Sequence, residues 1–272
     1  MIIDSHMSVP PDFSRAKVKI FEKITVESVL NWMNKLGVES SVVLTVAREP
    51  DDVSRCNDWN AKLMQDYPGK FLGFANVYPP RVKEALAELD RAITKLNLVG
   101  LKLHPRVQRF QMDDPSVMTI LERAKEYDIP VIFHVTSPAY LPFPAHLGEF
   151  AQDLADLDSN YSASISLRKI IPCYNSRKLI AAHMGGLYRP EISLGGILSQ
   201  TERSNISFQT TGACTEAIEH AYRTVGPNRI LYGSDSPFFD PADEIAKVNR
   251  ANIPEDAKKK IFSENIKKIL GL

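Results

Sequence analysis

The chain has 272 residues, of which 44% are hydrophobic and 24% are charged, and this composition is ordinary for a water-soluble protein with a sizeable core. Its 33 basic and 33 acidic residues cancel, which argues against nucleic acid or an anionic membrane surface as a partner. The three cysteines, Cys56, Cys173 and Cys214, are too few and too far apart for a disulfide framework. We find no signal peptide and no apolar stretch of membrane-spanning length. We therefore expect a cytoplasmic protein.

Short apolar runs alternate with longer segments of helical periodicity along the chain. Eight of these runs are expected to be strands buried on both faces: Met1–Ser5, Ser41–Val46, Phe71–Val77, Val99–Leu103, Val131–Phe133, Leu179–Ala182, Ile206–Thr210 and Ile230–Tyr232.

The segments between these runs space their apolar residues as amphipathic helices do, for example at Val26, Val29 and Met33. Residues Ile253–Leu272 are expected to form one final helix, with Pro254 at its start and Gly271 at its end. Eight strands that alternate with helices predict the α/β class and a single (β/α)8 TIM-type barrel, with one domain over residues 1–272.

Two long stretches interrupt the alternation, Val9–Lys23 after the first predicted strand and Thr136–Ser176 after the fifth. We expect both to lie over the barrel mouth, where this fold carries its substrate specificity, and we expect two short helices in the second. Tyr140, Phe143 and His146 could contact a substrate from there, although packing of the loop and surface exposure are the simpler interpretations.

Four of the six histidines directly follow a predicted strand, and a fifth strand is followed by an aspartate; these residues are His6, His104, His134, His183 and Asp235. Because the carboxyl ends of parallel barrel strands meet at one face, we expect the five side chains to converge. A single histidine at a strand end is more often a structural residue, but the repetition favours function. Imidazoles clustered with a carboxylate are typical of a divalent metal centre with acid/base partners.

Within this cluster, His6, His134 and Asp235 can supply three metal ligands and leave a position open for water or substrate. Asp4 is a fourth candidate ligand, because strand alternation puts it on the face of His6, although it could equally accept backbone hydrogen bonds. His183 then remains to move protons.

His104 and two neighbouring cations, Lys102 and Arg106, are candidates to bind a substrate carboxylate or to orient the substrate. For Lys102 an ordinary ion pair inside the barrel is the favoured interpretation. For Arg106, substrate binding and simple solvation are both open.

Five motifs carry a resemblance to a known family: Ile3-Asp4-Ser5-His6, Gly100-Leu101-Lys102-Leu103-His104-Pro105, Pro130-Val131-Ile132-Phe133-His134, Ala182-His183-Met184-Gly185-Gly186 and Leu231-Tyr232-Gly233-Ser234-Asp235-Ser236-Pro237. With these motifs in this order, nearly the whole chain resembles the amidohydrolase-2 group of the amidohydrolase superfamily, the branch like aminocarboxymuconate-semialdehyde decarboxylase. The resemblance implies a barrel that holds a divalent metal, most often zinc.

The resemblance also implies roles for single residues. His6 and His134 match metal-ligand positions, and Asp235 matches the eighth-strand carboxylate that binds the metal and handles protons. His183 matches a histidine that is a catalytic acid/base in the decarboxylase members. Two residues depart from the family pattern. Many members have histidine where this chain has Ser8, and aspartate where it has Gln209.

We therefore expect a metal-dependent, amidohydrolase-type hydrolase of a small carboxylate- or carbonyl-bearing substrate, in which Asp235 takes a proton from water and His183 steadies the developing negative charge. The alternative is a nonoxidative decarboxylase of an unsaturated or aromatic carboxylic acid, with His183 or Asp235 as the proton donor. A third possibility is a non-enzymatic binding barrel whose ligand set is incomplete at Ser8. A homodimer is compatible with the composition, which neither indicates nor excludes it.

Overall fold

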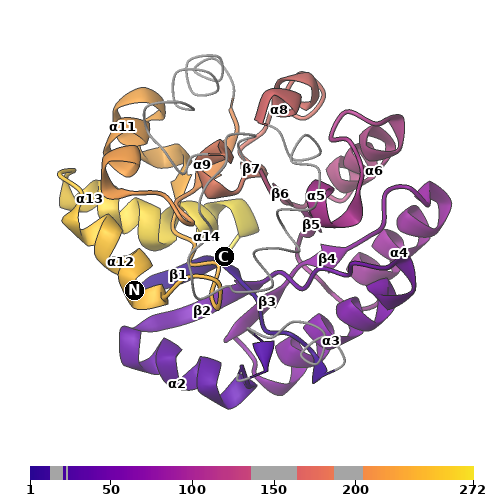
Figure 1. Ribbon diagram of the computed structural model, residues 1–272, viewed down its shortest axis with the longest axis horizontal. Coiled ribbons are helices and arrows are strands. Elements are labelled where there is room, and N and C mark those ends of the chain that lie inside the picture. The colour runs from indigo at the N-terminus through magenta and orange to yellow at the C-terminus, as the bar shows by residue number, and fades with distance from the viewer. Residues whose placement is uncertain (13–20, 23, 136–163, 187–204) are drawn as a thin grey trace.

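Parallel strands form a closed ring that is surrounded by helices (Figure 1). The computed structural model describes residues 1–12, 21–22, 24–135, 164–186 and 205–272. The strands of these ranges are β1 (Ile2–Met7), β2 (Val38–Val43), β3 (Phe71–Gly73), β4 (Ala75–Asn76), β5 (Leu101–Leu103), β6 (Val131–Phe133), β7 (Leu179–Ala181), β8 (Ser207–Gln209) and β9 (Ile230–Leu231).

Two sheets share this ring, one with the order β1-β2-β3 and the other running from β4 to β9, and every pairing within them is parallel. The sheets are joined through Phe74, the residue between β3 and β4, whose backbone nitrogen donates to Val43. At the other seam the Ser5 nitrogen donates to the Tyr232 carbonyl at 3.0 Å. With β3 and β4 counted as one broken strand, the described residues form the eight-stranded barrel that the sequence predicts.

Helices cover the ring, and some of them, such as α2, carry clear sequence signals at their ends. The described helices are α2 (Val26–Leu36), α3 (Val53–Asp66), α4 (Val82–Thr94), α5 (Pro105–Gln108), α6 (Pro115–Glu126), α8 (Ser164–Ile170), α9 (His183–Gly186), α11 (Thr215–Val225), α12 (Pro241–Arg250), α13 (Glu255–Lys259) and α14 (Asn265–Leu270). In α2, Thr25 and Ser28 form a reciprocal capping box, and Gly37 ends the helix in the left-handed conformation.

Several predicted boundaries differ from the observed ones. The second strand begins at Val38, three residues earlier than predicted, because Gly37 ends α2 directly before it. The expected final helix is interrupted between α13 and α14 by a π-helical turn, η6 (Lys260–Glu264), in which the Ile261 carbonyl accepts a hydrogen bond from Tyr232. Of the two short helices expected in the second loop, α8 lies within the described residues. Tyr140, Phe143 and His146 lie outside them.

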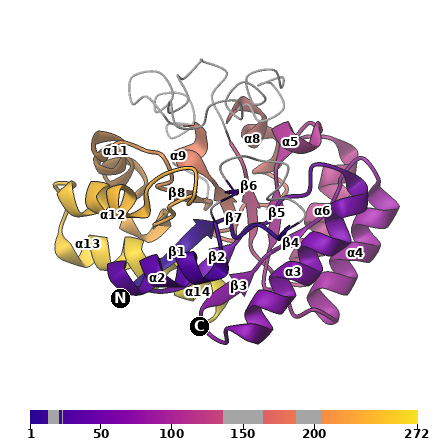
Figure 2. The ribbon, with the colours of Figure 1, turned by 60° about the horizontal axis from the view of Figure 1, so that its bottom comes forward.

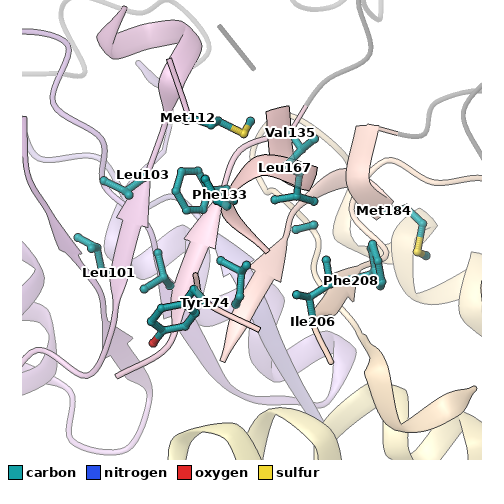
Figure 3. Close-up of a cluster of buried hydrophobic side chains, with 14 of the residues drawn as sticks. Leu101, Leu103, Met112, Phe133, Val135, Leu167, Tyr174, Met184, Ile206 and Phe208 are labelled. Carbon is teal, nitrogen blue, oxygen red and sulfur yellow. The ribbon is translucent and has the colours of Figure 1, made fainter. Parts of the chain in front are cut away.

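The apolar side chains of the barrel form two main clusters. The outer cluster lies between the strands and the helices, and Figure 3 shows part of it, with Leu103, Phe133 and Phe208 projecting from β5, β6 and β8. The inner cluster fills the barrel with strand residues such as Ile132 and Ile180, and it includes Ile266 and Ile269 of α14.

The helix α14 and the strand-end residues mark opposite ends of the barrel. In Figure 2, α14 lies below the strands, whereas α5 and α9, which follow the carboxyl ends of β5 and β7, lie above them. The mouth at the carboxyl ends therefore stays available for a site. Among the described residues, every helix is too short or too polar to cross a lipid bilayer.

The inner cluster yields a test of the barrel packing at Gly100. A methyl group added to Gly100 would lie 2.4 Å from the Phe74 ring, so Gly100→Ala is expected to lower the free energy of unfolding by about 1–3 kcal/mol. Urea denaturation measures this loss, and in a Phe74→Leu background the same substitution should cost less because the ring is gone. A Gly100→Ala protein as stable as the wild type would contradict the packing described for the barrel.

Candidate metal and catalytic site

The five predicted site residues follow different barrel strands and converge at their carboxyl ends. His6 lies in β1, His104 follows β5 and His134 follows β6. His183 follows β7, and Asp235 lies four residues beyond the end of β9. The backbone nitrogen of Asp235 donates to the His6 carbonyl at 2.6 Å, so the last strand end is held directly against the first.

Four imidazole rings form a continuous chain of contacts across the mouth. The rings of His104 and His134 stack at 3.8 Å between centroids, and His134 meets His183 edge-on at 4.5 Å. The His183 Nε2 atom lies 2.9 Å from His134 Nδ1. The chain ends at His6, whose ring centroid is 5.5 Å from that of His183. The convergence expected from the sequence is therefore present in the structure.

Three of these side chains could hold a metal ion together. His6, His183 and Asp235 each offer a ligand atom, and these atoms lie within 4.8 Å of one another. Asp235 Oδ1 is 3.4 Å from His6 Nε2. Two imidazole nitrogens and a carboxylate oxygen are a donor set that suits divalent transition metals.

The protonation of the histidines is compatible with metal binding. Burial, together with the positive charge of Lys102, lowers the pKa of His183 to about 3 and the pKa of His6 well below its usual value. Burial and neighbouring rings also lower the pKa values of His104 and His134. All four imidazoles are therefore neutral near pH 7 and keep a nitrogen lone pair, which is the form that binds metals. The residues present fit a divalent cation.

The other two predicted ligands are placed differently from this group. His134 contacts the group through His183, with His134 Nδ1 at 2.9 Å from His183 Nε2 and the two rings edge-on. The carboxylate of Asp4 accepts hydrogen bonds from the backbone nitrogens of His6 and Ser234 and from the Ser234 hydroxyl. These bonds tie Asp4 into the seam between the first and last strands. The alternative role considered for Asp4, as an acceptor of backbone hydrogen bonds, is what the geometry shows.

His183 after β7 and Asp235 after β9 have a backbone conformation that is uncommon for residues other than glycine. His183 has φ 53° and Asp235 has φ 54°, and Met184 after His183 has φ 50°. Left-handed conformations in such residues cost energy and occur most often where a side chain must be aimed at a site. Gly185 and Gly186 continue this turn with positive φ, as expected for a tight turn.

Lys102 reaches into the centre of the site and does more than the ordinary ion pair predicted for it. Its side chain is 1% exposed, and Nζ lies 3.4 Å from His6 Nε2. Burial lowers the pKa of Lys102, and the charge of Asp235 opposes this effect. Burial likewise raises the pKa of Asp235, and the charge of Lys102 opposes that shift. Lys102 and Asp235 are thus a buried acid–base pair in which the charge of each group opposes the effect of burial on the other.

His104 and Arg106 lie at the side of the mouth formed by β5 and α5. The His104 ring is the N-terminal cap of α5, and its Nδ1 accepts from the backbone nitrogen of Val107. Arg106 is 8% exposed, and its positive charge helps to lower the pKa of His104. A surface-solvated Arg106, one of the two alternatives, is therefore excluded by its burial.

Ser8 and Gln209, the two residues that depart from the family pattern, each have a hydrogen-bond partner in the structure. The Ser8 hydroxyl points to the Leu44 carbonyl at 3.5 Å. Gln209 is fully buried, and its Oε1 atom lies 3.0 Å from His6 Nδ1. The sequence interpretation favoured an ordinary ion pair for Lys102 and treated Gln209 only as a departure from the family pattern, so it placed neither beside His6. The available signal was strand alternation, which places Lys102 two residues before His104 and therefore on the same face of its strand.

Comparisons with known proteins agree with this architecture. A family model described as Amidohydrolase matches residues 37–272. The chain is similar to a gamma-resorcylate decarboxylase from Polaromonas, with 22% identity over 299 residues that span 96% of this chain and 88% of the relative. It is similar in structure to a 5-carboxyvanillate decarboxylase from Sphingomonas paucimobilis, with a TM-score of 0.76, 18% identity and coverage of 100% and 99% of the two chains. A 5-carboxyvanillate decarboxylase from Novosphingobium aromaticivorans, solved with manganese and 4-hydroxy-3-methoxy-5-nitrobenzoic acid, gives a TM-score of 0.76 at 20% identity, with 100% and 96% coverage. These full-length likenesses confirm the predicted barrel.

The neutral state of His183 predicts a loss of stability in acid. The pKa of this residue is about 3 in the folded protein, against 6.5 for a free histidine. Above pH 6.5 the ring is neutral in both states, whereas between pH 6.5 and 3 only the unfolded chain takes up the proton, so stability falls as the pH falls. From pH 7.5 to 5.0 this one group should cost about 2 kcal/mol.

Urea unfolding of the metal-free protein at both pH values checks this expectation. The His183→Gln protein lacks the imidazole. On going from pH 7.5 to 5.0, the unfolding free energy of the wild type should therefore fall by about 2 kcal/mol more than that of the variant. An equal acid effect on both proteins would mean that His183 is protonated in the folded state.

Proposed function

Because the chain belongs to the amidohydrolase family, we propose that it is a metal-dependent, nonoxidative decarboxylase of small aromatic carboxylic acids. The observation that carries this proposal is the group formed by His6, His183 and Asp235 at the mouth of the barrel. It is supported by the similarity, over almost the full length of both chains, to a decarboxylase of a hydroxylated benzoate.

The prediction from the sequence that the protein is a hydrolase is wrong. The full-length relative and the similar solved structures described above are decarboxylases, which break a carbon–carbon bond without adding water. The motifs in the sequence are shared by both reaction types, because both need a metal and a proton-handling carboxylate in the same barrel. The expectation of family membership is confirmed, whereas the reaction expected from it is replaced by the alternative considered beside it.

For the metal we assign His6, His183 and Asp235 as the residues that would hold it, with His134 beside them. Zinc, the ion expected from the sequence, and manganese both accept such nitrogen and oxygen ligands. Manganese is the first ion to test, because it is the metal in the similar Novosphingobium structure. When bound, a divalent ion supplies Lewis-acid stabilisation of negative charge on the substrate's oxygen atoms.

The chain's own groups provide substrate binding and the proton. Lys102, Arg106 and the His104 ring give one side of the mouth positive charge and hydrogen-bonding capacity, which suits a substrate carboxylate. In the metal-free protein, burial raises the pKa of Asp235 to about 8, which favours a bound proton near neutral pH. His183 lies beside it in the same group.

In the proposed reaction, Asp235 delivers its proton to the ring carbon that bears the carboxylate. The carbon–carbon bond then breaks, its electron pair returns to the ring, and carbon dioxide leaves. Water returns a proton to Asp235. One proton is consumed for each carbon dioxide released, and no oxidant or reductant is needed.

Three further expectations stay predictions beside this function. They are the single domain over residues 1–272, the cytoplasmic location and the homodimer. Size-exclusion chromatography with light scattering tests the homodimer directly.

A panel of hydroxybenzoates in D2O tests the reaction. We expect carbon dioxide and the decarboxylated arene in equal amounts, with one deuterium on the carbon that carried the carboxylate. Treatment with a chelator should abolish turnover, and Mn²⁺ should restore it. Products that retain the carboxyl carbon, or full turnover after verified metal removal, would overturn the proposal.

The role of Asp235 as proton donor is tested by Asp235→Asn at saturating Mn²⁺, with the bound metal measured, because the change removes the proton donor and also the charge of a proposed metal ligand. We expect kcat to fall about 10²–10⁴-fold, the range for loss of a general acid. Asp113→Asn is the matched control, because it removes a carboxylate that pairs with Lys169 at the surface, and it should leave kcat unchanged. Similar rates for wild type and Asp235→Asn would assign the proton donor elsewhere.

A further inference from the structure

Gln209 joins the first strand to the His6 ring from inside the barrel. The residue lies at the end of β8 and is fully buried. Its Nε2 atom lies 2.7 Å from the Ser5 carbonyl oxygen and 2.8 Å from the Ser5 hydroxyl oxygen. Its Oε1 atom lies 3.0 Å from His6 Nδ1. The Gln209 amide is therefore hydrogen-bonded at both ends.

The surroundings allow only one orientation of this amide. A backbone carbonyl only accepts hydrogen bonds, so the group that faces the Ser5 carbonyl must be the NH₂ group. The Ser5 hydroxyl already donates to the Tyr232 carbonyl at 2.5 Å and can only accept from Gln209. A flipped amide would place Oε1 against two acceptors. The network thus fixes Oε1 on the side of His6.

This orientation determines which nitrogen of His6 carries the proton. Because Gln209 Oε1 is an acceptor, His6 Nδ1 must donate to it and is the protonated nitrogen of the neutral ring. His6 Nε2 then carries the lone pair. That atom lies 3.4 Å from Asp235 Oδ1 and 3.4 Å from Lys102 Nζ, in the middle of the group that could hold a metal.

Without Gln209 the opposite tautomer would have a partner of its own. A proton on His6 Nε2 could be donated to the Asp235 carboxylate, which would occupy the nitrogen that a metal needs. The two tautomers therefore differ in whether the ring faces the site as an acceptor or as a donor. In the described structure the Gln209 amide contacts Nδ1 and favours the tautomer with the lone pair on Nε2, and Lys102 Nζ, 3.4 Å from Nε2, favours the same tautomer when it is protonated.

We propose that Gln209 is a positioning residue that holds His6 as the Nδ1-protonated tautomer and so presents the Nε2 lone pair to a divalent metal. This inference deepens the proposed function and rests on its metal site. The Ser5 carbonyl, the Gln209 amide and the His6 ring form one relay, in which a backbone group of the first strand sets the donor character of a side chain on the same strand. Partners of this kind fix the tautomer of metal-binding histidines and strengthen metal binding.

The first test reads the tautomer directly in the metal-free protein. In the wild type labelled with ¹⁵N-histidine at pH 7.5, His6 should show a protonated Nδ1 and an unprotonated Nε2, assigned by through-bond NMR. In Gln209→Leu, the His6 signals should shift toward the Nε2-protonated form. A wild-type His6 with an unprotonated Nδ1 would overturn the inference, and this result needs neither a variant nor an active enzyme.

The second test measures Mn²⁺ affinity by competition with a chelator. Gln209→Leu should weaken binding about 10–100-fold relative to the wild type, the usual effect of removing such a partner. Asn265→Leu is the matched control, because it removes another buried amide. That amide donates hydrogen bonds to the Pro227 and Ile230 carbonyls and is not part of the site. The Asn265→Leu protein should keep wild-type affinity, even if the change lowers stability as much as Gln209→Leu does.

The outcomes separate this inference from the proposed function. Unchanged Mn²⁺ affinity in Gln209→Leu would overturn the role of Gln209 while leaving decarboxylation intact. Tight Mn²⁺ binding with the expected tautomer, but no carbon dioxide from any substrate, would overturn the proposed reaction and leave the role of Gln209 standing. A wild type that binds no divalent metal would refute both.

Discussion

The seam between the first and last barrel strands is the constraint on which the site depends. The Asp4 carboxylate receives hydrogen bonds from the backbone and hydroxyl of Ser234, and the Asp235 nitrogen donates to the His6 carbonyl. These contacts join residues that are about 230 positions apart in the chain. Because His6 and Asp235 lie on either side of this seam, closing the barrel also sets the distance between the two proposed ligands. Asp4 therefore serves the site by holding the strands together.

Charge inside the closed barrel is balanced among few groups. The four imidazoles are neutral because burial opposes their protonation, and the charged forms of Lys102 and Asp235 favour each other. Removing charges from water is costly, so such a cluster is stable only when its members pair closely. A divalent ion bound to His6 Nε2 would lie close to Lys102, since Nζ is within 3.4 Å of that atom.

Much of the fold could be predicted from the sequence, because parallel strands buried on both faces appear as separate apolar runs. The same alternation predicted that His6, His104, His134, His183 and Asp235 would converge, since it depends only on where each strand ends. The break of the third strand at Phe74 and the π-helical turn before α14 could not be predicted, because each depends on contacts with distant residues.

The finer structure of the site was harder to predict for the same reason. Alternation puts Asp4 and His6 on one face, but the strand is irregular after Asp4, and the carboxylate turns to Ser234. The importance of Gln209 depends on Ser5, which lies on another strand. The reaction type was mispredicted because hydrolases and decarboxylases of this family share their metal-binding motifs, while the substrate decides which bond breaks.

His6, His183 and Asp235 are proposed to form one metal centre at the barrel mouth. Anomalous X-ray scattering from crystals soaked in Mn²⁺ tests this proposal most directly. We expect a single strong peak within coordination distance of all three side chains. A peak that lies elsewhere would contradict the proposed centre.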